Sequence, residues 1–206
     1  MPKIISPQVE FSGLLNQMKI VVPEVFSPDG KILNLLEGRW QQIGTPREFT
    51  SPVDGSQLGW MPMLNRETAL RGVLFAKGEA AAWAATDLDE RKRKVQDCLV
   101  QLRQHVELTG RLIMWEIGKT YKLGFTDIDR AIEGVQWYVD NIEGMLGQRK
   151  PLGLVSNIAS WNYPMSVLLH AVLVQVLAGN AVVAKTPTDG GFISLSLTFA
   201  VARRCG

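Results

Sequence analysis

Residues that could bind a metal ion or form disulfide bonds are scarce in this sequence. Its two cysteines, Cys98 and Cys205, lie far apart and form no CxxC motif. The two histidines, His105 and His170, have no partner at the spacing of a metal site or a catalytic triad. We therefore predict neither a zinc site nor a disulfide framework, and this cysteine usage is typical of a reducing compartment.

Long apolar runs are also absent. The most apolar stretch, Met165 to Ala178, is shorter than the ~18–20 residues that a bilayer requires, and it contains His170 and Gln175. Residues 1–7 lack the apolar core of a signal peptide. The sequence therefore predicts a buried helix in place of a membrane span, and a cytoplasmic protein without a membrane partner.

No charge of one sign dominates the chain. Lysine and arginine number 22 against 20 acidic residues, which gives a formal net charge of +2. This balance does not favour nucleic acid as a partner, and we interpret Arg91–Lys94 as a solvated helix face. Hydrophobic residues make up 46% of the chain, a fraction that argues for a globular fold with a sizeable core.

The pattern of the sequence divides the chain into three parts. Residues 1–36 are interpreted as a loosely organised N-terminal extension with a short helix over Ser12–Lys19. Residues 65–150 carry helical periodicity, and residues 151–206 show short apolar runs typical of strands. Turn signals at Glu37–Trp40 and around residue 53 bracket a short strand ahead of the helical part.

The helical part contains several expected helix starts. Asn65 is the expected N-cap of a helix through Trp83, because asparagine favours that position. Thr86 or Asp87 opens the next helix, and Thr126 starts another. The expected apolar stripes are Val95, Leu99, Leu102 and Val106 on one helix and Ile128, Ile132, Val135, Val139 and Ile142 on another, with a further helix over Gly110–Ile117 between them.

The last third predicts an α/β fold. Two apolar runs, Gly153–Ile158 and Ala181–Lys185, flank a helical segment, which predicts a parallel β-α-β unit buried on both faces. A final helix over Gly191–Arg204 packs back onto this sheet. Two parallel strands make too small a sheet, because each needs neighbours on both sides. We therefore expect these residues to be part of a larger fold.

Two polar residues follow the predicted parallel strands. Ligands of open parallel sheets bind beyond the carboxyl ends of the strands, and Asn162 and Lys185 both lie there. The amide of Asn162 can donate to an oxyanion, or it can cap a helix or turn. Lys185 can bind a ribose hydroxyl or a phosphate as a point charge, or it can be a solvated lysine. The residues alone leave both alternatives open.

Motifs around these two residues resemble the aldehyde dehydrogenase superfamily. The resemblance is carried by Trp161-Asn-Tyr-Pro164 and by the segment from Ala178 to Lys185, Ala-Gly-Asn-Ala-Val-Val-Ala-Lys. Weaker matches in family order are Glu37-Gly-Arg-Trp40, Ser51-Pro-Val-Asp-Gly55 and Trp115-Glu-Ile-Gly-Lys119. The resemblance implies that residues 37–206 form part of an NAD(P)-binding domain. The implied fold is a helical N-terminal part with the first β-α-β units of a doubly wound, Rossmann-like parallel sheet.

The resemblance also implies a chemistry. The family oxidises a small-molecule aldehyde to a carboxylic acid with NAD or NADP, through a thiohemiacetal on a cysteine. Carried over, Asn162 stabilises the oxyanion of that intermediate and Lys185 binds the adenosine ribose of the cofactor. The positions that line the same cofactor site are Ile158, Ala159, Ser160 and Trp161.

Two residues near these motifs depart from the family pattern. Ser160 stands where the family usually has proline, which makes the turn less rigid. Thr188 stands three residues after Lys185, where NAD-preferring members often have a glutamate that repels the 2′-phosphate of NADP. We predict NADP acceptance at least comparable with that of NAD. Asp189 is an alternative carboxylate that could restore the preference for NAD.

Other family parts are absent from these residues. The chain ends before the catalytic cysteine, the glutamate that activates water and the pyrophosphate-binding glycine turn, so the catalytic domain is absent and we expect the chain alone to be inactive. Cys205 lies at a helix end and Cys98 in a core stripe. The family oligomerises through a hairpin that is missing between Tyr138 and Pro151, which puts the homo-oligomer in doubt. The alternative is a non-catalytic fragment or pseudoenzyme acting as a binding or structural subunit.

Overall fold

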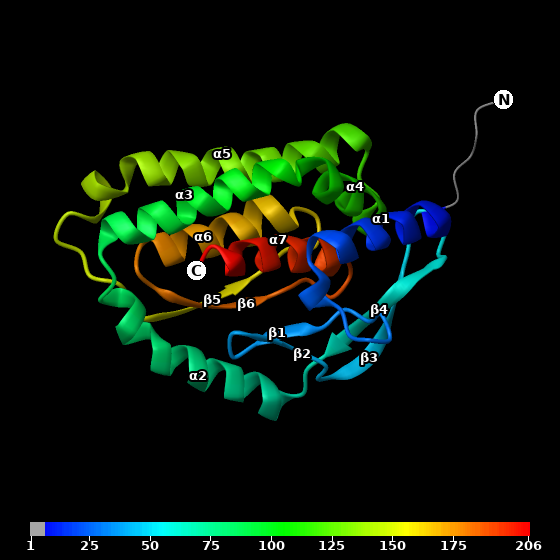
Figure 1. Ribbon diagram of the computed structural model, residues 1–206, viewed down its shortest axis with the longest axis horizontal. Helices are drawn as coiled ribbons and strands as arrows, with labels where there is room; N and C mark the ends of the chain where they lie inside the picture. The colour runs from blue at the N-terminus through cyan, green and yellow to red at the C-terminus, as the bar shows by residue number, and fades with distance from the viewer. Residues whose placement is uncertain (1–6) are drawn as a thin grey trace.

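The computed structural model describes residues 7–206, as three small sheets and a set of packed helices (Figure 1). In chain order the elements are α1 (Pro7–Val21), η1 (Pro23–Val25), β1 (Asn34–Leu36), β2 (Arg39–Gln41), β3 (Thr45–Thr50), β4 (Gln57–Met63), α2 (Arg66–Ala84), α3 (Leu88–Gln104), α4 (Val106–Ile117), α5 (Tyr121–Leu146), β5 (Leu154–Ile158), η2 (Pro164–Leu169), α6 (His170–Leu177), β6 (Ala181–Lys185) and α7 (Phe192–Arg204).

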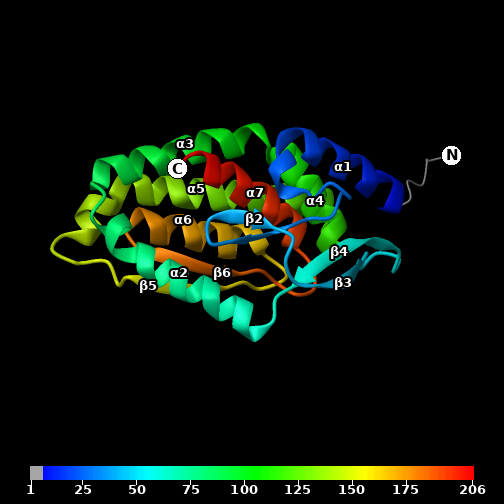
Figure 2. The same ribbon diagram turned by 60° about the horizontal axis from the view of Figure 1, so that its bottom comes forward.

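These elements form layers. Helices α3, α4 and α5 make an outer layer, α6 and α7 lie beneath it, and the β5–β6 ribbon follows (Figure 1). Helix α2 packs on the other side of this ribbon, as the turned view in Figure 2 shows. The antiparallel β3–β4 hairpin lies at the end of the molecule next to α1. Within residues 7–206, no helix combines the length and apolar content that a membrane span requires.

The N-terminal residues are part of the core. Helix α1 is longer than the expected Ser12–Lys19 helix, and it buries Phe11, Leu14 and Met18 against the body of the protein, next to α4. Residues 7–36 are therefore not a loosely organised extension, and that interpretation was wrong. Residues 1–6 lie outside the described part of the chain.

Capping decides where the helices begin. The Asn65 side chain accepts a hydrogen bond from the Thr68 amide at 2.8 Å, which confirms Asn65 as the N-cap of α2. Helix α5 begins at Tyr121, before the expected start at Thr126. Its N-cap is Thr120, whose hydroxyl accepts from the Leu123 amide. Helix α4 likewise begins earlier than expected, at Val106. Of the two candidates for the next start, Asp87 is the N-cap residue of α3.

Helices α4 and α5 approach closely because glycines face each other. A side chain on Gly124 would bring its Cβ within 2.5 Å of the Gly110 carbonyl oxygen, so the backbones touch there. The expected stripe of α5 is confirmed as buried, from Ile128 to Ile142. This close contact fixes the connection between the two helices, which carries Lys119, against the rest of the protein.

Arg91 corrects the interpretation of the basic run. Its side chain is buried, with Nε donating to the Leu177 carbonyl at 3.1 Å and Nη1 donating to the Thr86 carbonyl at 2.7 Å. Arg91 therefore connects the start of α3 to the end of α6. The run Arg91–Lys94 is a solvated face only from Lys92 onward, because a buried guanidinium that satisfies carbonyls belongs to the interior.

Strands β5 and β6 are parallel, as expected, but they are not buried on both faces. Their register pairs Leu154 with Ala181 and Ile158 with Lys185. None of their residues is fully buried, and Ile158 is 71% exposed. The expectation failed because the sheet has two strands within the described residues. Each strand then has an open edge, which leaves its apolar side chains partly uncovered.

The segment from Tyr138 to Pro151 contains no strand. Helix α5 continues to Leu146, and a short turn then leads to β5 at Leu154. The absence of a hairpin at this place, expected from the sequence, is confirmed.

Candidate functional site

The carboxyl ends of β5 and β6 lie side by side. Ile158 and Lys185 are register partners, and the Ala159 amide donates to the Lys185 carbonyl at 3.1 Å. The fold thus brings together the two segments that the sequence predicted to form one cofactor site. Ile158, Ser160 and Trp161 are exposed at this edge, with Trp161 at 59%.

Asn162 follows this edge and begins the turn into η2. It is exposed, and among residues 7–206 no hydrogen bond holds its side-chain amide. The N-cap position of η2 is Tyr163, which makes no side-chain cap. The helix-capping alternative for Asn162 therefore has no support in the structure. The amide NH2 is free to donate to a group placed at the sheet edge.

Lys185 and Thr188 lie together on the loop after β6. Lys185 Nζ donates to the Thr186 carbonyl at 3.0 Å and lies 3.5 Å from Thr188 Oγ1. Asp189 is turned to another partner, because its Oδ1 accepts from Arg47 Nη2 of β3 at 3.0 Å. The carboxylate nearest to Lys185 along the loop is thus paired with Arg47, and the neutral Thr188 is the side chain beside the lysine.

A buried ion pair lies beneath the Asn162 turn. Asp127 of α5 is 0% exposed, and its carboxylate accepts from the Ser166 amide at 3.0 Å and from Ser166 Oγ at 2.6 Å. Lys119 Nζ lies 3.3 Å from Asp127 Oδ2 and 3.8 Å from the ring centroid of Tyr163. Sequence reasoning missed this pair, because Lys119 and Asp127 contact residues about 40 positions further along the chain.

Comparison with known proteins accords with this geometry. A model of the aldehyde dehydrogenase family matches residues 40–206. The chain belongs to the aldehyde dehydrogenase family. The match includes both motifs at the sheet edge, from Trp161 to Pro164 and from Ala178 to Lys185.

The chain spans about two fifths of the length of the individual aldehyde dehydrogenases that it matches. A curated relative, the NADP-dependent glyceraldehyde-3-phosphate dehydrogenase of Streptococcus equinus, is 27% identical over 188 residues, which are 82% of this chain and 40% of the relative. The fold matches that of a 1-pyrroline-5-carboxylate dehydrogenase from Thermus with bound NAD, at a TM-score of 0.81 and 18% identity, over 95% of this chain and 40% of the other.

A second solved structure contains NADP in place of NAD. The NADP-dependent glyceraldehyde-3-phosphate dehydrogenase from Bacillus halodurans C-125, solved in complex with NADP, matches at a TM-score of 0.76 and 23% identity, over 83% of this chain and 40% of the other. These similarities establish the fold as that of part of an aldehyde dehydrogenase.

A second buried carboxylate supports the loop that carries Lys185 and Thr188. Glu116 of α4 is 1% exposed, and its two oxygens accept from the Ile193 and Ser194 amides at 2.7 and 2.9 Å. It thereby caps the N-terminus of α7, where the loop ends. Burial raises the pKa of Glu116 to about 7. From the sequence, the Trp115–Lys119 segment was notable only for its resemblance to the family, and the capping role of Glu116 was not predicted.

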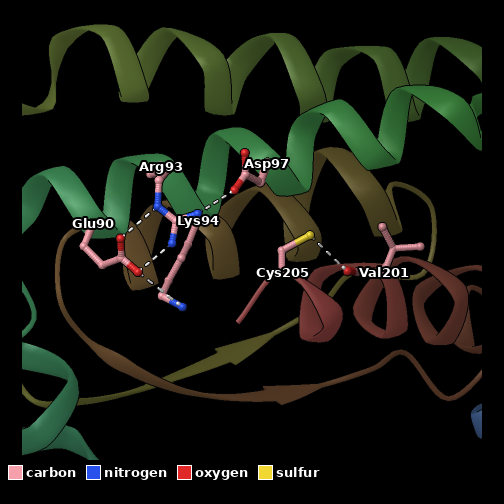
Figure 3. A network of polar contacts seen from close by, with 6 residues as sticks. All are labelled: Glu90, Arg93, Lys94, Asp97, Val201 and Cys205. Atoms are coloured by element: carbon pink, nitrogen blue, oxygen red, sulfur yellow. Dashed lines mark hydrogen bonds and ion pairs between the residues drawn. The ribbon is translucent and has the colours of Figure 1, made fainter.

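Neither cysteine has the properties of an aldehyde dehydrogenase nucleophile. Cys205 lies at the end of α7, and its thiol donates to the Val201 carbonyl at 3.4 Å (Figure 3). The nearby Arg93 is paired with Glu90 and Asp97. Burial raises the pKa of both the Cys205 and the Cys98 thiols. Neither thiol therefore has the lowered pKa of an activated nucleophile.

Proposed function

We propose that these 206 residues supply the oxyanion donor and part of the cofactor site of an NAD(P)-dependent aldehyde dehydrogenase. The observation that carries the proposal is the pairing of Ile158 with Lys185 at the carboxyl edge of a parallel sheet, with Asn162 four residues after Ile158 on the turn that leaves this edge. Open parallel sheets bind their ligands at this edge. The family membership gives the edge its chemistry.

Each residue has a stated role in the proposal. Asn162 donates its amide to the oxyanion that forms when a cysteine thiolate attacks a small aldehyde. Lys185 hydrogen-bonds the adenosine ribose of NAD or NADP, and Ile158, Ala159, Ser160 and Trp161 line the same site. The proposal assigns the nucleophile to a part of the enzyme outside residues 1–206, because Cys98 is buried and desolvation raises the pKa of both the Cys98 and the Cys205 thiols.

The role of Lys185 is tested by alanine substitution in the full product of this gene. We expect Lys185→Ala to raise the KM for NAD(P) about 10- to 100-fold, because a charge-assisted hydrogen bond is lost, with a smaller effect on kcat. Steady-state kinetics of aldehyde-dependent NAD(P)H formation measures both constants.

Two controls accompany the Lys185 experiment. Lys150→Ala changes an exposed lysine outside the sheet edge and should leave the KM unchanged. The purified 206-residue chain, assayed alone, should form no NAD(P)H. An unchanged KM in Lys185→Ala would remove the cofactor role. Turnover by the chain alone would contradict the placement of the nucleophile, and absence of turnover in the full gene product would favour the binding or structural subunit.

Thr188 is expected to set the cofactor preference. Thr188→Glu places a carboxylate beside Lys185, where it can bind the ribose hydroxyls of NAD and repel the 2′-phosphate of NADP. We expect the ratio of kcat/KM for NADP to that for NAD to fall about tenfold or more. The neutral Thr188→Gln is the matched control and should keep the wild-type ratio. A wild-type enzyme that already rejects NADP would contradict this assignment.

A further inference from the structure

We propose that Asp127, held in place by Lys119, is a positioning residue that fixes the Trp161–Pro164 turn and so the direction in which Asn162 donates. This inference rests on the proposed function, since it concerns the geometry of the same donor. Within residues 7–206, no hydrogen bond or ion pair joins Asp127 or Lys119 to Lys185 or to the strands. They act on the turn through their contacts with Tyr163 and with the first residues of η2.

Asp127 satisfies the free amides at the start of η2. A helix begins with amides that have no partner inside it. Here Pro164 has no amide hydrogen and Tyr163 provides no cap, so the Met165 and Ser166 amides need an outside acceptor. Asp127 Oδ1 accepts from Ser166, and Oδ2 is 3.4 Å from the Met165 amide. A carboxylate at this position also matches the positive end of the helical dipole.

Lys119 connects the carboxylate to the turn itself. Its side chain is 10% exposed, and its ammonium makes no regular hydrogen bond with any residue in the described part of the chain. Its partners are the Asp127 carboxylate and the face of the Tyr163 ring, at 3.3 and 3.8 Å. A cation over an aromatic face is attracted to it. Since Tyr163 directly follows Asn162, Lys119 holds the residue that sets the orientation of Asn162.

Asn162 depends on this support because it has none of its own. Within residues 7–206 no hydrogen bond orients its side chain, and Ser160 replaces the stiffer proline before Trp161. A misplacement of about 1 Å at a reacting group can cost ~100-fold in rate. Loss of Asp127 should therefore lower kcat, whereas the KM for the cofactor depends on Lys185 and should change little.

The first experiment compares kinetics in the full product of the gene. We expect Asp127→Asn to lower kcat about 10- to 100-fold, with the KM for NAD(P) within about threefold. Asp129→Asn is the matched control, since Asp129 is exposed on the same helix, and it should retain the wild-type kcat. An Asp127→Asn enzyme with wild-type kcat would overturn the inference.

A double variant separates positioning from stability. Asp127→Asn leaves the Lys119 charge buried without its counter-ion, which lowers the melting temperature. Asp127→Asn combined with Lys119→Met removes both charges and should recover part of the melting temperature, while kcat stays low because one of the two carboxylate acceptors and the cation over Tyr163 are gone. Recovery of kcat together with the melting temperature would show a structural role only, and would overturn the inference.

A second readout does not depend on catalysis. In the 206-residue chain, hydrogen exchange of the Met165 and Ser166 amides should accelerate in Asp127→Asn and remain at the wild-type rate in Asp129→Asn. Unchanged exchange in Asp127→Asn would overturn the inference even if the enzyme is active. If the full gene product oxidises no aldehyde, the proposed function fails, yet the exchange rates still decide whether Asp127 holds the turn.

Discussion

Replacement of Asn162 by alanine in the full product of this gene is expected to lower kcat about 100- to 1,000-fold, which corresponds to ~3–4 kcal/mol of transition-state stabilisation. The reason is that the donor acts on the charge that develops when the thiohemiacetal forms, and contributes little before that step. The KM for NAD(P) should change little, because Lys185 carries the cofactor contact. Steady-state and single-turnover kinetics on the same preparations separate the two constants.

Two further variants sharpen the Asn162 test. Asn162→Asp keeps the size of the side chain but presents a negative charge to the oxyanion, so its loss of kcat should be at least as large. Asn141→Ala removes an exposed asparagine of α5, whose amide donates to the Trp137 carbonyl, and should leave kcat at the wild-type value. An Asn162→Ala enzyme with normal kcat would show that the oxyanion is stabilised by other groups.

Local signals in the sequence predicted the elements that position the site. The strands β5 and β6, the N-cap at Asn65 and the stripe of α5 each depend on residues within a few positions of one another. The join between Ile158 and Lys185 also followed, because parallel strands of one β-α-β unit place their carboxyl ends at the same edge.

Long-range contacts could not be predicted in this way. Asp127 caps η2 and Glu116 caps α7, and each carboxylate lies on a helix that precedes its target by tens of residues. From the sequence alone, Asp127 and Glu116 resemble ordinary solvated acidic residues, because no neighbouring residue indicates that either carboxylate is buried. Arg91 was wrongly predicted to be solvated for the same reason, because its partner, the Leu177 carbonyl, lies far away in the sequence.

The interpretation of the N-terminal residues as a loosely organised extension was wrong for a different reason. Phe11, Leu14 and Met18 recur at helical spacing. This pattern predicts a helix, but the predicted range of Ser12–Lys19 is shorter than α1. Burial of these residues depends on α4, about 100 positions later in the chain. A helix whose apolar face is covered by a remote element looks, from its own residues, like a marginal one.

The stability of the 206-residue chain should depend on pH through Glu116. Burial raises its pKa from the ordinary 4.5 to about 7. Between these pH values the folded chain binds the proton more tightly than the unfolded chain, so the free energy of unfolding falls as pH rises through this window. The expected contribution is ~3 kcal/mol, fully present below pH 4.5 and lost above pH 7. Urea unfolding at a series of pH values measures it.

The contribution of Glu116 is the difference between wild type and Glu116→Gln, which lacks the titrating group. Burial lowers the pKa of His105 and His170, and those groups favour unfolding as pH falls, which is the opposite direction. Subtracting the two profiles removes their effect. Glu107→Gln, at an exposed position of α4, is the control and should give a profile parallel to wild type. If the Glu116→Gln profile is parallel as well, Glu116 is ionised throughout this range, and the two α7 amides outweigh its burial.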